Sequence, residues 1–240
     1  MTTAPALRLK TALADRERLL VVNIDYSNAS LVQFVARELA DVVFIDCEQG
    51  DTSIETIPDL VRAAHLERTP VLVRLPDSRP ETIERYMFRG GDGIVVPRLD
   101  RPADAAAVVE TVRYCFAEEA AGKSIVVQIE SGEAARAIDR FLAVPGIDAL
   151  FVGPVDLARS LGKAGRYEDP EVDAVIRGLL SKIVAGRRSA GMLAQARTIS
   201  GLERAGINFL YLHVNDFLLH GRGPFRAGGN ATRSETGRAP

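Results

Sequence analysis

The chain has 240 residues, of which 47% are hydrophobic and 26% are charged, a balance typical of one globular domain. Its 30 basic and 32 acidic residues give a net charge of −2, which argues against nucleic-acid and anionic-membrane partners. Two cysteines, and an amino terminus without the apolar segment of a secretory signal, are typical of a cytoplasmic protein with reduced thiols.

Short apolar runs rich in β-branched residues alternate along the chain with longer amphipathic segments. The runs are unbroken rather than alternating, which is typical of parallel strands that are buried on both faces. We expect strands over residues 19–24, 42–47, 71–75, 93–97, 124–130, 148–152, 191–194 and 208–213. We expect helices over residues 29–39, 54–65, 80–89, 103–120, 133–142, 170–186 and 199–205.

Eight strands separated by helices predict an α/β fold of the (β/α)8 TIM-barrel type. The alternative is a doubly wound sheet, which would carry a glycine-rich turn after the first strand, where this chain has Asp25-Tyr26-Ser27-Asn28. The barrel is expected to occupy residues 17–220, after an N-terminal lead-in over residues 1–16. A tail over residues 221–240 is rich in Gly, Arg, Ser and Thr, which predicts disorder.

Polar residues follow the apolar runs at the strand ends, where barrel enzymes of this type collect their reactive side chains. Burying so many polar groups without a polar cleft would be costly, so we expect a cleft at these ends. The polar residues at the strand ends are Asn23, Asp25, Asp46, Glu48, Gln49, Arg74, Arg98, Gln128, Glu130, Ser131, Asp156, Gln195, His213 and Asn215.

Two carboxylates at neighbouring strand ends form the strongest candidate site. Glu130 and Asp156 end the fifth and sixth expected strands, so their side chains can converge. Two carboxylates, completed by waters and substrate oxygens, suit Mg²⁺, Mn²⁺ or Co²⁺. Alternatively, each caps a helix: Glu130 the helix after Ser131-Gly132, and Asp156 the helix over Leu157–Leu161.

A cation and a glycine turn complete the candidate site. Arg74 ends the third strand, where a guanidinium can stabilise an oxyanion or clamp a carboxylate. Alternatively, Arg74 forms a structural ion pair with Asp46 or Glu48. The turn at Gly153-Pro154 opens a short helix whose backbone N–H groups could hold a substrate carboxylate, or it is a plain strand-to-helix turn.

Three segments together resemble one family. They are residues 44–51 (FIDCEQGD), 126–131 (VVQIES) and 151–162 (FVGPVDLARSLG), and they resemble the HpcH/HpaI family of metal-dependent 2-keto-3-deoxy acid aldolases, kin of the citrate lyase β subunit. VLVRLP (71–76) and GIVVP (93–97) also lie in place, and the resemblance covers about residues 9–219.

The resemblance implies a barrel of the phosphoenolpyruvate/pyruvate-binding type and a homo-oligomer. It also implies reversible cleavage of a 4-hydroxy-2-keto acid to pyruvate and an aldehyde, through a pyruvate enolate that a divalent metal stabilises. By this resemblance Glu130 and Asp156 match metal ligands, and Arg74 matches the arginine that stabilises the enolate oxygen. The residues expected to bind the keto acid are Gln128, the turn at Gly153, Pro154 and Val155, and Asp46 and Glu48.

One motif departs from the family pattern. The family usually reads Asp-Gly-Glu-His where this chain has residues 46–49 (DCEQ), so Gln49 stands in the place of the catalytic base. Glutamine cannot take a proton near pH 7. The family aspartate that supports the missing histidine aligns with Phe88. One hypothesis is that His213, at the end of the eighth strand, supplies the base; alternatively, it packs against Tyr26 or Asn215.

The departure leaves several reactions open. Decarboxylation of an oxaloacetate-like substrate forms an enolate without a base, so it is compatible with Gln49, as is a Claisen-type condensation with a thioester. A non-catalytic protein that binds a keto acid is the alternative from another class. The retained Glu130, Asp156, Arg74 and Gln128 argue against it, because a dead site has no need of all four.

Overall fold

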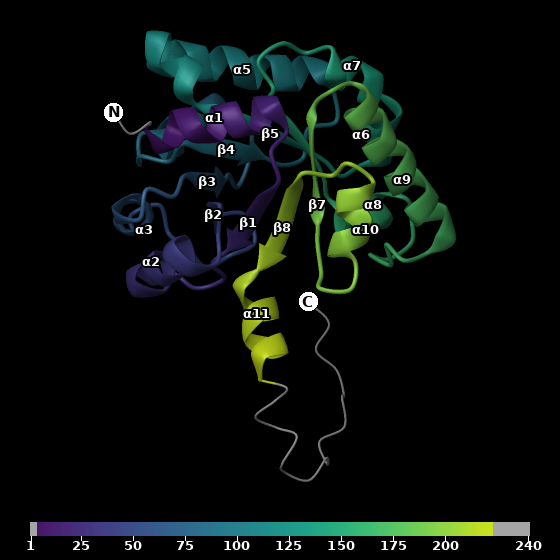
Figure 1. Cartoon of the computed structure of the whole chain (residues 1–240). Coiled ribbons are helices and arrows are strands. Elements are labelled where there is room, and N and C mark those ends of the chain that lie inside the picture. Colours follow the sequence, from purple (N-terminus) through teal and green to yellow (C-terminus); the bar gives the residue numbers. More distant parts are fainter. Residues whose placement is uncertain (1–3, 223–240) are drawn as a thin grey trace.

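A computed structural model of the chain describes residues 4–222, in which parallel strands close into a barrel with the helices outside it (Figure 1). The strands pair in chain order, and β1 pairs with β8 to close the barrel. The strands are β1 (Leu19–Asn23), β2 (Val42–Asp46), β3 (Val71–Arg74), β4 (Gly93–Val96), β5 (Ser124–Ile129), β6 (Ala149–Val152), β7 (Ser189–Leu193) and β8 (Phe209–His213). The predicted barrel is confirmed.

The helices connect the strands and bury one apolar face against them. Strands β2 to β6 are buried along their whole length, as expected of parallel strands covered on both faces. The helices are α1 (Pro5–Asp15), α2 (Ala29–Glu38), α3 (Ile57–Leu66), α4 (Pro80–Met87), α5 (Pro102–Phe116), α6 (Gly132–Arg136), α7 (Ile138–Leu142), α8 (Pro154–Ser160), α9 (Pro170–Ala185), α10 (Ile199–Arg204) and α11 (Val214–Gly221), with a 3-10 turn η1 (Ala117–Gly122) after α5.

Helix α1 closes the N-terminal end of the barrel, within the segment that the sequence indicated only as a lead-in. Leu9, Ala12 and Leu13 lie on one face of α1 and are buried in the same cluster as the residues inside the barrel. Lys10 Nζ fixes the helix by an ion pair of 2.8 Å with Asp148, just before β6. With this end filled, the open end of the barrel is the one at which the strands finish.

Aromatic rings fill the barrel up to the level of the site. Phe44, Phe151 and Phe209 pack edge-on against each other or against Tyr211, with ring centroids 4.9 to 5.8 Å apart. A Cβ atom at Gly191 would lie 2.8 Å from the Phe151 ring and 2.9 Å from the Phe209 ring, so only glycine fits beside them. Phe151 and Tyr211 of this group also line the cavity above it.

The predicted elements differ from the structure at a few boundaries. Strand β7 begins at Ser189, two residues before the predicted start, because Ser189 pairs with Ala149 of β6. Its buried hydroxyl accepts the Asn208 amide N–H, so a polar residue lies in the strand where the apolar pattern does not predict one. The helix expected over residues 133–142 is divided into α6 and α7. No helix within residues 4–222 is long and apolar enough to cross a membrane. The tail expected to be disordered lies, from residue 223 onward, outside the described residues.

Candidate functional site

A cavity of about 480 Å³ opens at the C-terminal ends of the strands. It is lined by Asn23, Ile24, Asp25, Asp46, Gln49, Gly50, Asp51, Thr52, Arg74, Gln128, Phe151, Gly153, Pro154, Val155, Asp156, Leu193, Tyr211, His213 and Asn215. Most of the site residues expected from the sequence are among them. Glu48 and Glu130 are not in this lining, and lie directly behind it.

Arg74 forms an ion pair with Asp46, as the structural alternative predicted, and it also lines the cavity. Its Nε and Nη2 atoms donate to the two carboxylate oxygens of Asp46, at 2.8 and 2.5 Å. Asp46 also accepts the backbone N–H groups of Glu48 and Gln49. Burial raises the pKa of Asp46, but the hydrogen bonds and charge of Arg74 outweigh it, so the net pKa is lowered. The guanidinium is therefore fixed in one orientation at the cavity wall.

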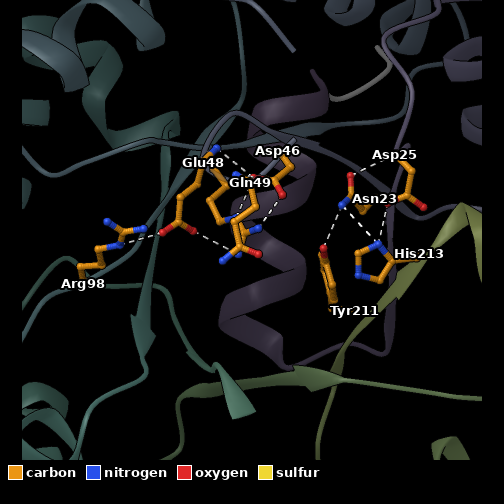
Figure 2. A network of polar contacts seen from close by, with 9 residues as sticks. Asn23, Asp25, Asp46, Glu48, Gln49, Arg98, Tyr211 and His213 are labelled. Carbon is orange, nitrogen blue, oxygen red and sulfur yellow. Dashed lines mark hydrogen bonds and ion pairs between the residues drawn. The ribbon is translucent and has the colours of Figure 1, made fainter. Parts of the chain in front are cut away.

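Glu48 lies between two arginines, Arg98 and Arg74, and Figure 2 shows its pair with Arg98. Its Oε1 atom pairs with Arg98 Nε at 3.0 Å. Its Oε2 atom lies 3.3 Å from Arg74 Nη1, but without hydrogen-bond geometry, so this oxygen has no hydrogen-bond partner in the described part of the chain. Because the Arg98 side chain is 70% exposed, water screens its pair. Burial raises the pKa of Glu48 despite both arginines.

Glu130 carries a buried oxygen that no group within residues 4–222 satisfies. Its Oε1 atom accepts the backbone N–H of Arg98 at 2.6 Å, while Oε2 has no hydrogen-bond partner. Gln128, which is 3% exposed, has an unpartnered Oε1 atom as well. Burial raises the pKa of Glu130 to about 7; the Arg98 N–H opposes this shift, and the charges of Glu48 and Asp156 add to it. Several unpaired acceptors thus meet beside the cavity, an arrangement that a cation would stabilise.

Neither Glu130 nor Asp156 caps a helix, so those alternatives are wrong. Ser131 caps α6 through its hydroxyl, which accepts the N–H of Ala134. Gly153 is the N-terminal cap residue of α8, and Asp156 lies inside the first turn. The Asp156 carboxylate lines the cavity and pairs with the exposed Arg159 at 2.8 Å. Glu130 and Asp156 follow the neighbouring strands β5 and β6, and the charge of Asp156 adds to the raised pKa of Glu130.

Gln49 lines the cavity, but Phe88 does not. Phe88 follows α4, is 58% exposed, and packs against Phe116 with ring centroids 5.1 Å apart. Within residues 4–222, Gln49 and Phe88 are therefore not brought together in the cavity.

His213 lines the cavity and pairs with a carboxylate that the sequence analysis left without a role. Its Nδ1 atom lies 2.6 Å from Asp25 Oδ1. Tyr26 and Asn215, the partners expected in the alternative reading, instead bond each other at 2.8 Å. Figure 2 shows Asn23, Asp25, Tyr211 and His213 as one group. The pairing follows from barrel closure, because β1 and β8 are neighbours with Asn23 opposite His213.

A parallel barrel with acidic, amide and arginine side chains around a cavity at its strand ends is the arrangement of a barrel enzyme. The family model described as HpcH/HpaI aldolase/citrate lyase matches residues 20–209. The chain belongs to this family, which confirms the resemblance and the class that it implied, a carbon–carbon lyase.

Individual relatives agree with this assignment. The chain is 30% identical over 213 residues to a hydroxypyruvate/pyruvate aldolase of Agrobacterium fabrum, covering 79% of this chain and 80% of that protein. It is 29% identical to a 5-keto-4-deoxy-D-glucarate aldolase of Salmonella paratyphi C, over 64% and 69% of the two chains. The crystal structure of a family protein from Burkholderia cenocepacia has the same fold, with a TM-score of 0.84 at 24% identity over 91% and 97% of the chains.

Proposed function

We propose that the chain makes or breaks a carbon–carbon bond of a 2-keto acid, such as pyruvate or oxaloacetate, beside a divalent cation held by Glu130 and Asp156. The observation that carries this proposal is the buried, unpartnered Oε2 atom of Glu130, whose carboxyl has a pKa raised to about 7. The relatives named as aldolases of hydroxypyruvate or pyruvate, and of 5-keto-4-deoxy-D-glucarate, support a keto acid as the substrate.

The residues present fit a hard cation. Within residues 4–222 there is no cluster of three or more His, Cys, Asp or Glu side chains suited to a metal. Two carboxylates would therefore be completed by waters and substrate oxygens, which suits Mg²⁺, and also Mn²⁺ or Co²⁺. A cation bound there would supply Lewis-acid polarisation of the keto group.

The other side chains orient the keto acid. Arg74, fixed by Asp46, presents a permanent positive charge to the oxygen that becomes negative when the enolate forms. Gln128 lies beside the same cavity with a free acceptor atom. The start of α8 offers the backbone N–H of Val155, where the substrate carboxylate would lie. Pro154 has no N–H, and the Gly153 N–H bonds the Ile129 carbonyl at 3.0 Å.

Aldol cleavage and decarboxylation share the pyruvate enolate and differ in their need for a base. Gln49 cannot supply one, which is the observation that favours decarboxylation of an oxaloacetate-like substrate as a second candidate. A Claisen-type condensation would use the same enolate. The second substrate, an aldehyde or a thioester, stays a prediction, as do the homo-oligomer and the cytoplasmic location.

The first experiment measures pyruvate release from oxaloacetate by the purified protein with Mg²⁺ or Mn²⁺, and then with EDTA. We expect turnover that saturates with metal and is lost with EDTA. Because divalent ions decarboxylate oxaloacetate by themselves, the rate with metal alone is subtracted. Metal-dependent keto-acid binding without turnover on any 2-keto acid would make the chain a binding protein. No metal binding would overturn the site at Glu130 and Asp156.

A methyl group at Gly153 tests whether the turn touches the substrate site. A Cβ atom there would lie 3.1 Å from both Gln128 Nε2 and Glu130 Oε2. We expect Gly153→Ala to fold and to lower kcat/KM by about tenfold or more, equivalent to about 1.4 kcal/mol of transition-state stabilisation. The matched control is Gly178→Ala in α9, where a Cβ atom would meet open space. It should keep wild-type kinetics and gain about 0.5–1 kcal/mol of stability. If Gly153→Ala and Gly178→Ala had the same kcat/KM, the turn at Gly153 would not be part of the substrate site.

A further inference from the structure

We propose that Asp25 and His213 form the proton-transfer pair of this site, with His213 Nε2 exchanging the proton and Asp25 positioning the imidazole. The inference rests on the proposed function, because it supplies the base that a carbon–carbon lyase of this kind needs. In this pair His213 Nε2 is the atom that exchanges the proton, and the Asp25 carboxylate holds the imidazole in position.

The pair is held from both sides. Asp25 Oδ1 lies 2.6 Å from His213 Nδ1, and Asp25 Oδ2 accepts the backbone N–H of Asn215 at 3.2 Å. The Asp216 side chain accepts the backbone N–H of His213, also at 3.2 Å. Asp25 has a φ of 53°, a left-handed conformation that aspartate adopts more readily than most residues and in which its N–H bonds Asn23 Oδ1. The chain therefore fixes both the carboxylate and the ring.

This arrangement selects one tautomer. A carboxylate accepts, so Nδ1 carries the hydrogen and the lone pair lies on Nε2. Asn23 Nδ2, which donates to Tyr211 at 2.9 Å, also lies 3.5 Å from Nδ1, but the contact of Nδ1 with the Asp25 carboxylate is far shorter, at 2.6 Å, and sets the tautomer. Among residues 4–222 no hydrogen bond of full geometry joins Nε2 to a protein group; the backbone N–H of Asp216 approaches the ring only as part of the capping box that begins α11. Since the His213 side chain is 40% exposed and lines the cavity with Arg74, this nitrogen is open to a substrate.

Among the described residues that line the cavity, His213 is the one imidazole; carboxylates line it too, and of these Asp156 is assigned to the cation and Asp46 to Arg74. Gln49 cannot take a proton, and Arg74 stays protonated. The chain has three histidines. His65 pairs with Asp92, just before β4 and thus at the opposite end of the barrel, and His220 lies in α11, so His213 is the imidazole of the cavity. In a retro-aldol step, Nε2 takes the proton of the 4-hydroxyl group as the C3–C4 bond breaks. C4 becomes the aldehyde carbon, the electron pair passes to C3 to give the enolate, and the imidazolium returns the proton to C3 to yield pyruvate.

The charges around His213 set the pH at which it acts. Burial lowers its pKa, but the hydrogen bond and charge of Asp25, aided by Asp216 and opposed by Arg74, raise it above the ordinary value of 6.5. A base acts in its unprotonated form, so activity should rise with pH through this raised pKa. Asp25→Asn removes the negative charge, so the acid limb of its pH profile should move to lower pH.

The experiment compares two reactions of the metal-loaded enzyme. Exchange of the pyruvate methyl protons with deuterium requires a base, whereas oxaloacetate decarboxylation forms the enolate without one. For His213→Gln we expect exchange to fall by about 100-fold or more, with a much smaller loss of decarboxylation. For Asp25→Asn we expect exchange to fall by about tenfold or more, with the acid limb displaced to lower pH.

The matched control is His65→Gln, which removes a histidine–aspartate pair of 2.8 Å outside the cavity and should leave both rates within about twofold. If His213→Gln exchanged pyruvate protons near the wild-type rate, or lost both reactions equally, His213 would not be the base. The proposed function would still stand. An unmoved acid limb in Asp25→Asn would overturn the role of Asp25. Absence of metal-dependent decarboxylation and exchange in the wild type would overturn the proposed function itself.

Discussion

We expect the Glu130→Gln variant to lose metal-dependent turnover and, in the absence of metal, to be more stable than the wild type near pH 8. Both effects have one cause, which is that Glu130 is buried among acidic neighbours with one oxygen unpaired. Glutamine keeps the shape and an acceptor for the Arg98 N–H, but it removes the charge on which the cation depends. The residue that binds the cation thus destabilises the fold without it.

The raised pKa of Glu130 makes the metal-free protein less stable as the pH rises. Between the ordinary pKa of 4.5 and the folded-state value of about 7, the folded protein binds more protons than the unfolded chain. This contribution to stability is present below about pH 4.5 and is lost by about pH 7. A shift of this size corresponds to about 3 kcal/mol, which is the upper bound for the gain in Glu130→Gln near pH 8.

Urea unfolding in EDTA at about pH 5 and about pH 8 measures this effect. We expect Glu130→Gln to exceed the wild type mainly at the higher pH, and saturating Mg²⁺ to stabilise only the wild type. The matched control is Asp139→Asn, at a carboxylate that is 70% exposed and pairs with Lys182, and it should change neither property. A variant that keeps metal-dependent turnover, or that is less stable than the wild type at both pH values, would contradict the prediction.

The strands could be predicted because burial on both faces leaves an unbroken apolar pattern in the sequence. Where a polar residue interrupts that pattern, the predicted strand boundary is displaced. The buried Ser189, which begins β7, is such a residue. Helix α1 was not predicted, because only Leu9, Ala12 and Leu13 in it are buried. Its stability comes from closing the barrel end, a contact that appears only once the strands have been assembled.

Which residues gather in the site could be predicted, but their partners could not. The ends of parallel strands meet at one rim, so Glu130, Asp156 and Arg74 were placed without coordinates. The pairing of Asp25 with His213 joins positions 188 residues apart, and it depends on the register of β1 against β8. The unpartnered oxygen of Glu130 is likewise a property of the packed structure, because it depends on which donors are out of reach.

Arg74→Met should cost about 3–5 kcal/mol of stability, because it leaves the buried carboxylate of Asp46 without its cation. Turnover should fall by about 100-fold or more, since the charge opposite the enolate oxygen is lost. The control is Arg177→Met, which breaks an exposed pair with Asp173 and should cost less than about 1 kcal/mol.

The double variant Arg74→Met/Asp46→Asn separates the two effects of Arg74. Asparagine keeps an oxygen for the backbone N–H groups of Glu48 and Gln49 but carries no charge, so the stability lost through Asp46 should return, while Glu48 still lacks the nearby charge of Arg74. Activity should not return, because no cation then faces the developing negative charge. Urea unfolding and pyruvate release from oxaloacetate measure both quantities. If turnover were recovered in the double variant, the role of Arg74 would be to neutralise Asp46. Arg74 would then have no direct part in the reaction.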